Sequence, residues 1–473
     1  MKTARDGIDG NVILITDGYK FTHWKQYPPG TTKVHSYFES RGGEYPATLF
    51  FGLQYQLMRY LEGKVVTQAK IEEAEEIVAL HLGDKAMFNR EGWEHILDEH
   101  KGKLPLRIRA VPEGTVVPYR NVLMTVENTD PKCYWLPNYM ETLLVQVWYP
   151  TTVATQSMFM KKSIQKYLEE TGTPSLIDFK LHDFGFRGVS SVESAAIGGG
   201  AHLVNFRGTD TTAALMFHRS YYDEPMAGFS IPAAEHSTIT SWGRENEDKA
   251  MRNMLEQFPK GTVAVVSDSY NIFEACRSIW GGKLRNQILS RGGALVIRPD
   301  SGDPQKVLLE VLNILAEQFS FSVNDKGYKV LYEKVRLIQG DGIDYRMVGT
   351  ILETLRQNGW SADNIAFGSG GALLQKLNRD TEKFAFKCSS VTVNGEERNV
   401  YKNPITDPGK SSKMGLIKLI REGDEYLTVQ QSAPGKDELV KVFEDGKVLI
   451  KYPLSEIRRR ADEGIKRIPA AIA

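Results

Sequence analysis

"ALVIRPDSGDPQKVLLEVLNILAEQF", residues 294–319, reads as one strand followed by one helix. The apolar run at its start ends in "RPDSG", a turn sequence rich in Pro, Asp and Gly. Asp303 is then a candidate helix cap, and Pro304 suits the first helical turn. Apolar residues follow at helical spacing: Leu308, Leu312, Leu315 and Phe319. The stretch therefore predicts one β/α unit.

Further apolar runs of the same form, each ending in turn residues, lie on both sides of this unit. They are "LIDFKLHDFG", "HLVNFRG", "AGFSIPA", "TVAVVSDS", "VRLIQGDG", "NIAFGSGG" and "FAFKCSS". Strand and helix alternating about eight times predict parallel β/α units that close into a barrel, with a doubly wound open sheet as the alternative.

The first part of the chain has no such regular alternation. Residues 1–175 mix expected strands, "NVILIT" and "LRIRAV", with helical stretches such as "AKIEEAEEIVALHLG". We therefore expect an α/β protein with a mixed α+β domain over 1–175, joined by the C-terminal segment 390–473, and a β/α barrel domain with the active site over 176–389.

Composition limits the classes of function. Lys plus Arg equals Asp plus Glu at 59 each, so bulk charge gives no reason to expect a nucleic acid or an anionic membrane as partner. Cys133, Cys276 and Cys388 are far apart and lack metal-binding spacing, which favours a reducing compartment. No stretch approaches the roughly 18 apolar residues that cross a bilayer. We expect a cytoplasmic protein.

The ends of the expected strands concentrate chemically active residues. In order they are "HDFGFRG", "GTD", "PAAEHS", "SDSY", "RPDSG", "QGDG" and "FGSGG". In parallel β/α folds the loops after the strands build the active site. The ionisable groups and glycines therefore predict one shared site.

Phosphate binding is indicated by "FGSGGALLQKL", residues 367–377. The amides of Ser369, Gly370 and Gly371 can face a phosphate where a strand turns into a helix, although such turns are structural about as often as functional. Basic residues that follow favour a ligand with several phosphates: Arg379, Lys387, Lys402, Lys410 and Lys413. For each lysine taken singly, a solvated surface position is the plainer interpretation.

Carboxylates stand at two neighbouring strand ends. Asp300 and Asp341 can hold ribose hydroxyls or a hydrated Mg²⁺, and Asp300 can equally begin an Asx turn. Asp210 is ordinary as a helix cap, and Phe184 is ordinary as a core residue.

His236 stands beside Glu235 and can reach Asp268 at the next strand end. A histidine oriented by carboxylates becomes more basic, which suits a nucleophile or a general base. No His or Cys partner has metal-binding spacing, and no Gly-x-Ser-x-Gly elbow is present, so a metal site and a hydrolase triad are disfavoured. A partly buried histidine with satisfied hydrogen bonds is the alternative.

Taken together, the motifs resemble the nicotinamide phosphoribosyltransferase family from about residue 11 to about residue 460. They are "TDGYKFTHWKQYPPGT", "ETLLVQVWYPTTVAT", "HDFGFRGVSS", "GTDTTAAL", "IPAAEHSTI", "VVSDSYNIF", "IRPDSGDP", "IQGDGID", "IAFGSGGALLQKLNRD" and "FKCS". The resemblance implies a type II phosphoribosyltransferase with an incomplete β/α barrel and a mixed α+β domain, forming a homodimer with active sites at the subunit interface. The implied reaction joins nicotinamide to 5-phosphoribosyl 1-pyrophosphate with Mg²⁺, while ATP phosphorylates His236.

The resemblance also implies a role for each matched residue. Around the nicotinamide it places Phe184, Asp210, Arg298 and, from the other subunit, Tyr19. Around the ribose and its 5′-phosphate it places Asp300, Gly340, Asp341, Arg187, Gly370, Gly371 and Arg379. Around the pyrophosphate and ATP it places Arg41, Lys387, Lys402 and Lys410. Glu235 and Asp268 would orient His236, and Mg²⁺ would bind through substrate phosphates, with Asp300 as the candidate protein ligand.

Two other functions compete with this one. A nicotinate phosphoribosyltransferase shares the fold and the phosphate chemistry, but Asp210 would repel the nicotinate carboxylate. A non-catalytic nucleotide-binding regulatory protein is disfavoured because the Asp, Arg and His residues at the strand ends are all present.

Overall fold

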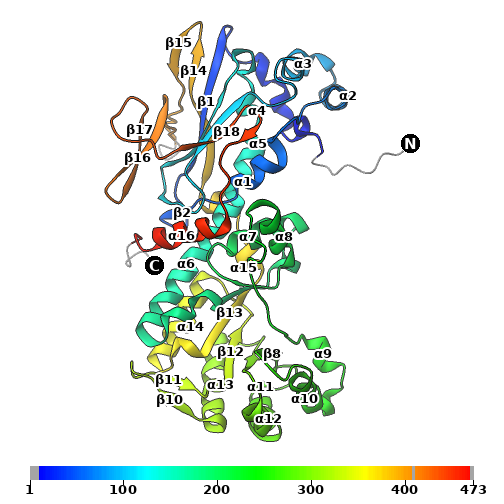
Figure 1. The fold of residues 1–473 in the computed structure, drawn as a ribbon, viewed down its shortest axis with the longest axis vertical. Helices are drawn as coiled ribbons and strands as arrows, with labels where there is room; N and C mark the ends of the chain where they lie inside the picture. Colours follow the sequence, from blue (N-terminus) through cyan, green and yellow to red (C-terminus); the bar gives the residue numbers. More distant parts are fainter. Residues whose placement is uncertain (1–9, 407–410, 469–473) are drawn as a thin grey trace, which may run out of the picture. The chain divides into compact units, whose positions relative to one another are not determined.

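The computed structural model describes residues 10–406 and 411–468. The chain divides into two compact units: unit 1 contains the described residues up to Thr155 with Tyr221–Asp223 and Asn378–Ile468, and unit 2 contains Gln156–Ser220 and Glu224–Leu377. The division falls inside the long helix α6 (Trp148–Thr171) (Figure 1). The boundary expected from the sequence, at residue 175, lies after the end of this helix. No helix within the described ranges combines the length and the apolarity needed to cross a membrane.

Unit 1 contains a seven-stranded antiparallel sheet with the order β15-β14-β1-β5-β3-β18-β19. Its strands are β1 (Thr31–Ser40), β3 (Leu106–Ala110), β5 (Val122–Asn128), β14 (Phe384–Val393), β15 (Glu396–Asn399), β18 (Val440–Glu444) and β19 (Lys447–Val448). Two-stranded sheets are formed by β2 (Ala47–Leu49) with β4 (Val116–Pro118) and by β16 (Ile417–Glu422) with β17 (Glu425–Gln430). Strands from the two ends of the chain therefore share one sheet.

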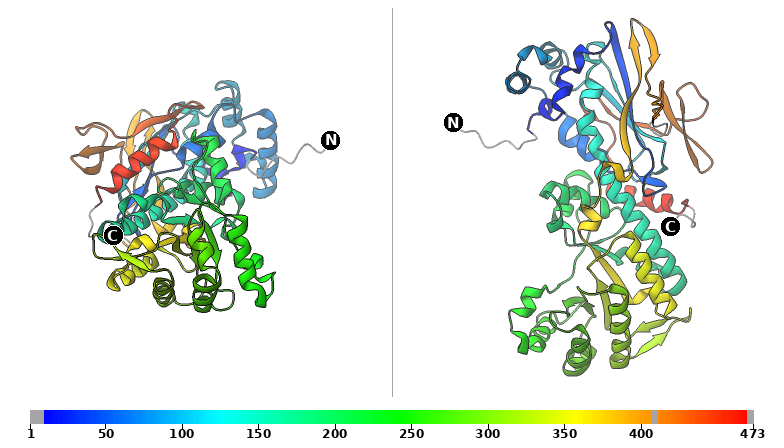
Figure 2. Two further views of the ribbon diagram at one scale, coloured as in Figure 1. Left: turned by 60° about the horizontal axis from the view of Figure 1, so that its bottom comes forward. Right: turned by 180° about the vertical axis from the view of Figure 1, so that it is seen from behind.

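Helices cover one face of the large sheet in unit 1 (Figure 1 and Figure 2). The helices of this unit are α1 (Leu53–Gln56), α2 (Gln68–Leu82), α3 (Arg90–Asp98), α4 (Leu136–Tyr139), α5 (Glu141–Leu144) and α16 (Leu454–Ile465). Trp93 of α3 packs edge-on against Trp135, with ring centroids 4.8 Å apart, and both rings belong to the apolar core. This packing fixes α3 against the segment that precedes α4.

Unit 2 contains a six-stranded sheet with the order β7-β6-β13-β12-β9-β8, in which all neighbouring strands are parallel. The strands are β6 (Leu181–Asp183), β7 (Gly208–Thr209), β8 (Val263–Val266), β9 (Leu295–Arg298), β12 (Val335–Gln339) and β13 (Ile365–Ser369). A separate hairpin pairs β10 (Phe321–Val323) with β11 (Lys329–Leu331). The parallel arrangement places the carboxyl ends of the six strands at one edge.

An irregular segment connects the two edge strands of this sheet. Phe229 bridges to Gly208 in β7, and Ala233 bridges to Ala264 in β8. The connection includes Pro232, which lacks the N–H group that a regular central strand needs. The expected incomplete barrel is therefore confirmed, with residues 229–233 standing where a closing strand would lie.

The helix expected after residue 303 is confirmed as α13 (Pro304–Phe319). The Asp303 carboxylate accepts a hydrogen bond from the Gln305 N–H at 3.1 Å, as a helix cap should. The other helices of unit 2 are α7 (Val192–His202), α8 (Thr212–Tyr221), α9 (His236–Thr240), α10 (Glu247–Gln257), α11 (Ile272–Glu274), α12 (Arg285–Ser290), α14 (Tyr345–Gln357) and α15 (Gly371–Leu374).

Replacing Leu312 with alanine should lower the free energy of unfolding of unit 2 by about 2–5 kcal/mol, because this fully buried side chain would leave a cavity. Urea denaturation measures the change. Glu317→Ala on the same helix is the matched control, since its position is exposed and the expected change is within about 0.5 kcal/mol. Equal effects of the two substitutions would contradict the helix orientation.

Three strand predictions are wrong in whole or in part, and a fourth expected strand forms but joins the sheet of unit 1. One of the three is "AGFSIPA", residues 227–233, which contains only the two isolated bridges described above. "NVILIT" is not a strand: Asn11 accepts a hydrogen bond from the Ile13 N–H at 3.1 Å, and this local bond favours the 3₁₀ turn η1 (Val12–Leu14). In "HLVNFRG", residues 202–206 belong to the end of α7 and the turn after it, leaving Gly208 as the start of β7. "FAFKCSS" lies in β14, which pairs antiparallel with β1 in unit 1. Its apolar pattern predicts a strand but carries no information about which sheet the strand joins.

Candidate functional site

The expected site residues of unit 2 follow the carboxyl ends of its parallel strands. Phe184 follows β6, Asp210 follows β7, Asp268 follows β8, Asp300 follows β9, Gly340 follows β12 and Gly370 follows β13. Because neighbouring strands are parallel, these residues emerge from the same edge of the sheet. The prediction that the strand ends meet at one edge is therefore confirmed.

His236 begins the short helix α9, and its half-exposed ring lies between two carboxylates and a hydroxyl. Nε2 lies 3.6 Å from Asp268 Oδ1 and 3.5 Å from Asp300 Oδ2. On the other side of the ring, Nδ1 lies 3.3 Å from the Ser269 hydroxyl oxygen. These contacts restrict the orientation of the imidazole.

The orientation of the Asp268 carboxylate is fixed by two hydrogen bonds to one of its oxygens. Its Oδ2 accepts hydrogen bonds from the Asp300 N–H at 3.0 Å and from the Ser301 hydroxyl. The side chain is 5% exposed, and among the described residues its buried Oδ1 has no hydrogen-bond partner. A buried carboxylate oxygen without a donor is costly, so this atom is available to a hydrogen-bond donor or a metal ion of a ligand complex.

Glu235 is exposed and accepts a hydrogen bond from the Ser237 hydroxyl in the same turn. Its expected role in orienting His236 stays a prediction. Asp300 and Ser269 are neighbours of His236 that the sequence did not assign to it. Ser269 directly follows Asp268 in "SDSY", and this position at a strand end could have predicted that it lies near His236.

Asp210 is flanked by two polar side chains at the expected base pocket. Its Oδ1 lies 3.2 Å from His182 Nε2 and accepts a hydrogen bond from the Ser230 hydroxyl. Burial by itself raises the pKa of Asp210, but His182, Ser230 and Arg298 outweigh burial, and the pKa is lower than that of an ordinary aspartate. Asp210 is therefore ionised at neutral pH and presents a fixed negative charge.

Phe184 lies against two glycines at the strand ends. A Cβ atom added to Gly368 would lie 2.0 Å from the Phe184 ring, and one added to Gly340 would lie 3.2 Å from it. The Phe184 N–H also donates to the Ser369 carbonyl oxygen at 2.9 Å. The ring is only partly buried: one part packs against the two glycines, and the rest is accessible to solvent.

Arg298 is largely buried near the same strand ends. Its Nη2 lies 3.9 Å from Asp300 Oδ2, and within the described part of the chain its Nε has no hydrogen-bond partner. A buried guanidinium with a free N–H group can donate to a ligand.

The glycine-rich turn after β13 has unfilled space next to the backbone of Gly371. Gly370 precedes the four-residue helix α15, and a Cβ atom added to Gly371 would meet no other atom within 4 Å. Arg187 in η8 (Phe186–Gly188) and Asp341 after β12 are both exposed. The turn therefore leaves space for a phosphate beside Gly371, while the helix is too short to add a strong dipole.

The remaining expected cations lie in unit 1. Burial lowers the pKa of Lys387 on β14, Glu141 opposes this shift, and the nearby Arg41, Lys402 and Arg379 lower the pKa further. These four basic residues therefore form one cluster, as a site for a polyanion requires.

Two further expected residues of unit 1 have separate surroundings. Arg41 Nε lies 3.1 Å from Glu39 Oε1, while its buried Nη2 has no hydrogen-bond partner in the described ranges. Tyr19 in η2 (Gly18–Lys25) is 61% exposed, so its ring is free to meet another surface. Lys410 lies outside the described residues.

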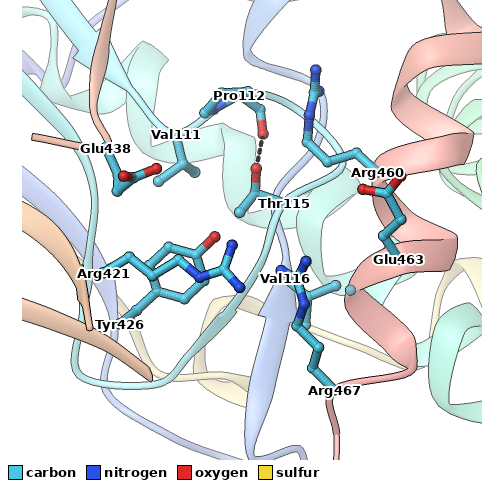
Figure 3. A pocket seen from close by; sticks show the side chains of 11 residues that line it. Val111, Pro112, Thr115, Val116, Arg421, Tyr426, Glu438, Arg460, Glu463 and Arg467 are labelled. Atoms are coloured by element: carbon cyan, nitrogen blue, oxygen red, sulfur yellow. Dashed lines mark hydrogen bonds between the residues drawn. The ribbon is translucent and has the colours of Figure 1, made fainter. Parts of the chain in front are cut away.

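Unit 1 also contains a cavity of about 190 Å³ that none of the expected site residues line. Arg421, Arg460 and Arg467 line it together with Glu438 and Glu463 (Figure 3). Arg460 donates to the Glu113 carbonyl oxygen and to Glu456, and Arg421 donates to Asp424. Since its cations have partners within the protein, this cavity is a weaker candidate site than the strand ends.

Comparisons with known proteins match almost the whole chain. Residues 11–108 match the N-terminal domain of nicotinamide phosphoribosyltransferase, and residues 179–447 match the nicotinate phosphoribosyltransferase (NAPRTase) family. A nicotinamide phosphoribosyltransferase of Xanthomonas campestris is 53% identical over 96% of this chain and 98% of that protein. One of Acinetobacter baylyi is 34% identical over 95% of this chain and 97% of that protein.

Two solved structures share the fold at low sequence identity. Nicotinate-nucleotide pyrophosphorylase from Pyrococcus furiosus matches with a TM-score of 0.63 and 16% identity, covering 99% of both chains. Human nicotinic acid phosphoribosyltransferase matches with a TM-score of 0.60 and 16% identity, covering 97% of this chain and 94% of that one. These matches confirm the α/β fold class.

Proposed function

This chain belongs to the nicotinamide phosphoribosyltransferase family of enzymes, and from that membership we propose that it makes nicotinamide mononucleotide for NAD biosynthesis. The reaction transfers the phosphoribosyl group of 5-phosphoribosyl 1-pyrophosphate to the ring nitrogen of nicotinamide and releases pyrophosphate. The observation that carries the choice of substrate is the charged Asp210 between His182 and Ser230.

Asp210 separates nicotinamide from nicotinate by charge. The carboxamide NH₂ of nicotinamide donates a hydrogen bond to an ionised carboxylate, whereas the carboxylate of nicotinate repels it. Because the surroundings lower the pKa of Asp210, protonation does not relieve that repulsion at neutral pH. This favours nicotinamide phosphoribosyltransferase over the nicotinate enzyme and over a regulatory protein without a base pocket.

The base is held by aromatic rings in this proposal. Phe184, seated on Gly340 and Gly368, stacks on one face of the pyridine ring. Tyr19 of the partner subunit in a homodimer covers the other face, consistent with the exposure of this side chain in unit 1. Each stacked pair contributes about 0.5–1.5 kcal/mol beyond burial. The stacking orients the ring nitrogen toward the ribose.

Breaking the bond between ribose C1 and pyrophosphate builds negative charge on the leaving group. Arg41, Lys387 and Lys402 of the basic cluster are preorganised to stabilise that charge more strongly in the transition state than in the ground state. Arg379, the fourth member of the cluster, is assigned to the 5′-phosphate. Arg187 and the amides at Gly370 and Gly371 hold the 5′-phosphate, and Asp300, Gly340 and Asp341 line the ribose.

The residues near His236 fit a magnesium ion. Asp268 Oδ1 is a buried carboxylate oxygen without a donor in the described residues, and the Asp300 carboxylate lies at the same imidazole nitrogen. These two carboxylates would hold Mg²⁺ together with substrate phosphate oxygens. When bound, Mg²⁺ neutralises charge on the phosphates. The protein side chains orient His236 and the ribose around it.

His236 is the proposed acceptor of a phosphoryl group from ATP, forming an N–P bond as ADP leaves. With two carboxylates facing Nε2, the ring proton is favoured there and the reactive lone pair on Nδ1. Phosphorylation at this point changes the local charge by about −2 and thereby couples ATP to phosphoribosyl transfer.

His236→Ala should lose the stimulation by ATP, so that the rate with ATP falls to the rate without it. Pyrophosphate release measured with and without ATP gives the result. Ser237→Ala is the control, since the Ser237 hydroxyl bonds Glu235 in the same turn and is not assigned to ATP. Full ATP-stimulated turnover in the His236 variant would rule out the phosphohistidine.

The whole proposal is tested by comparing pyrophosphate release with nicotinamide and with nicotinate, each with and without ATP. Turnover with nicotinamide and none or little with nicotinate is expected. A preference for nicotinate would overturn the role of Asp210. No turnover with either base would favour the regulatory protein.

A further inference from the structure

Four side chains in unit 1, none of which serves the proposed reaction, bring metal-ligand atoms together. His95, His100, Asp130 and Cys133 each offer one ligand atom, and these atoms lie within 4.8 Å of one another. Both imidazoles direct Nε2 at the same oxygen, Asp130 Oδ2, and each distance is 2.7 Å. The two imidazoles therefore converge on one carboxylate oxygen, and the thiol of Cys133 lies within 4.8 Å of all three ligand atoms.

The local fold fixes the residues that carry these groups. His95 lies in the last turn of α3, and His100 lies in the turn after it. Asp130 caps η5 (Pro131–Cys133): its Oδ1 accepts from the Lys132 N–H at 2.8 Å, and its carbonyl oxygen accepts from the Cys133 N–H at 2.9 Å. Oδ1 is thus used for the cap, and Oδ2 is directed at the histidines.

The backbone around the cluster is braced as well. The Asn128 side chain donates to the Asp130 carbonyl oxygen at 2.8 Å, and the core contact of Trp93 with Trp135 joins α3 to the residues after η5. Such supporting contacts orient ligands before a metal binds and raise the affinity of the site.

The donor set and its spacing suit one kind of ion. His-x₄-His and Asp-x₂-Cys have the separations seen in the two halves of tetrahedral zinc sites. Two imidazoles, one carboxylate and one thiolate make four nitrogen, oxygen and sulfur donors, which favour Zn²⁺ over the oxygen-seeking Mg²⁺. Four protein ligands leave no open position, which is typical of a structural site.

The cluster is partly buried, as expected for a metal site near the protein surface. The side chains of His95, His100 and Asp130 are 17%, 25% and 18% exposed, so an ion can reach them from solvent. Cys133 is fully buried and belongs to the apolar core, so it closes the inner side of the cluster.

We propose that His95, His100, Asp130 and Cys133 bind one Zn²⁺ ion that ties α3 to η5 and stabilises unit 1. On binding, each imidazole directs an Nε2 lone pair at the ion: a neutral ring carries its one proton on Nδ1, and a doubly protonated ring releases one proton to solvent. The thiol proton of Cys133 also passes to solvent, so that the sulfur binds as a thiolate. Ligand atoms at bond lengths of about 2.0–2.3 Å from a tetrahedral ion lie about 3.3–3.7 Å from one another. The imidazole nitrogens, now 2.7 Å from Asp130 Oδ2, therefore move away from it by roughly 0.6 Å, and ligand atoms that now lie farther apart, up to 4.8 Å, move closer.

The test uses the full chain, treated with a chelator and then titrated with Zn²⁺ in the absence of nucleotide and 5-phosphoribosyl 1-pyrophosphate. Calorimetry should give about one ion per chain, since the four ligands form one site. Thermal denaturation should show the melting temperature rise by about 5–10 °C at a hundredfold excess over the dissociation constant. Co²⁺ in place of Zn²⁺ should give the absorption bands of tetrahedral coordination with a thiolate ligand.

Variants separate this site from other metal binding. Cys133→Ser should remove the thiolate band of Co²⁺, and His100→Gln should weaken Zn²⁺ binding at least tenfold. His81→Gln, at an exposed position on α2, is the matched control and should bind as the parent protein does. Unchanged Zn²⁺ affinity in the two cluster variants, no binding by the parent protein, or a preference for Mg²⁺ would overturn the proposal. Turnover with Mg²⁺ is measured in parallel and should be unchanged.

Discussion

Asp210→Asn should shift the ratio of kcat/KM for nicotinate to that for nicotinamide at least about a hundredfold toward nicotinate. Like charges in a site cost several kcal/mol, and each 1.4 kcal/mol corresponds to a factor of ten. Asparagine removes the repulsion against nicotinate and replaces a charged hydrogen bond to nicotinamide with a neutral one. Steady-state kinetics with both bases at saturating 5-phosphoribosyl 1-pyrophosphate measure the ratio.

The pH dependence gives a second measure of the same charge. Because the pKa of Asp210 lies below the ordinary value of about 4, the carboxylate keeps its charge between about pH 8 and about pH 6. The preference of the parent enzyme for nicotinamide should therefore stay constant over that range, and the variant should lack the preference throughout.

Ser230→Ala is the matched control for Asp210→Asn, because it removes a hydrogen bond to the carboxylate and keeps the charge. It should change the ratio much less than Asp210→Asn does, because the charge that separates the two bases remains and the lost hydrogen bond affects both bases alike. If the two variants changed the ratio equally, geometry and not charge would set the specificity.

The sequence predicted the β/α units well where the signal was local. Asp303, Pro304 and the apolar repeat that follows lie within one helix, so cap and periodicity agree without knowledge of the rest of the fold. The strand at 384–390 shows the limit of such signals. Its partner β1 lies more than 340 positions earlier in the chain, and an apolar run does not specify its partner.

The candidate site divides in the same way. Asp268 could be placed near His236 because strand ends of a parallel sheet meet at one edge, whereas Asp300 was predicted only for the ribose or Mg²⁺. His182 was missed as the neighbour of Asp210, because their contact depends on the register that sets His182 opposite Gly208 across β6 and β7. Register arises from tertiary packing and is not readable from one strand alone.

The zinc ligands were missed for a related reason. The cysteines were compared only with one another, and Cys133 has no cysteine partner at metal spacing. Its partners are His95 and His100, which α3 and the turn after it bring to η5 across a separation of about 30 residues. A search for paired ligands of mixed type could have found them.

Gly368→Ala should raise the KM for nicotinamide at least about tenfold. The added Cβ would lie 2.0 Å from the Phe184 ring, far closer than two carbon atoms approach without bonding, so the ring must leave its seat on β13. Loss of the stacking partner costs about 0.5–1.5 kcal/mol, and displacement of the ring into the base pocket adds to that cost. The KM for 5-phosphoribosyl 1-pyrophosphate should change much less, because Phe184 is assigned to the base alone.

A double-mutant cycle with Phe184→Ala decides whether the ring transmits the effect. Gly368→Ala should have little further effect on the KM for nicotinamide once the ring is absent, since the added methyl group then has nothing to displace. Gly340→Ala gives a graded comparison: its Cβ would lie 3.2 Å from the same ring, so a smaller shift accommodates it. Additive effects of Gly368→Ala and Phe184→Ala, or a larger effect at Gly340 than at Gly368, would show that these glycines do not act by seating Phe184.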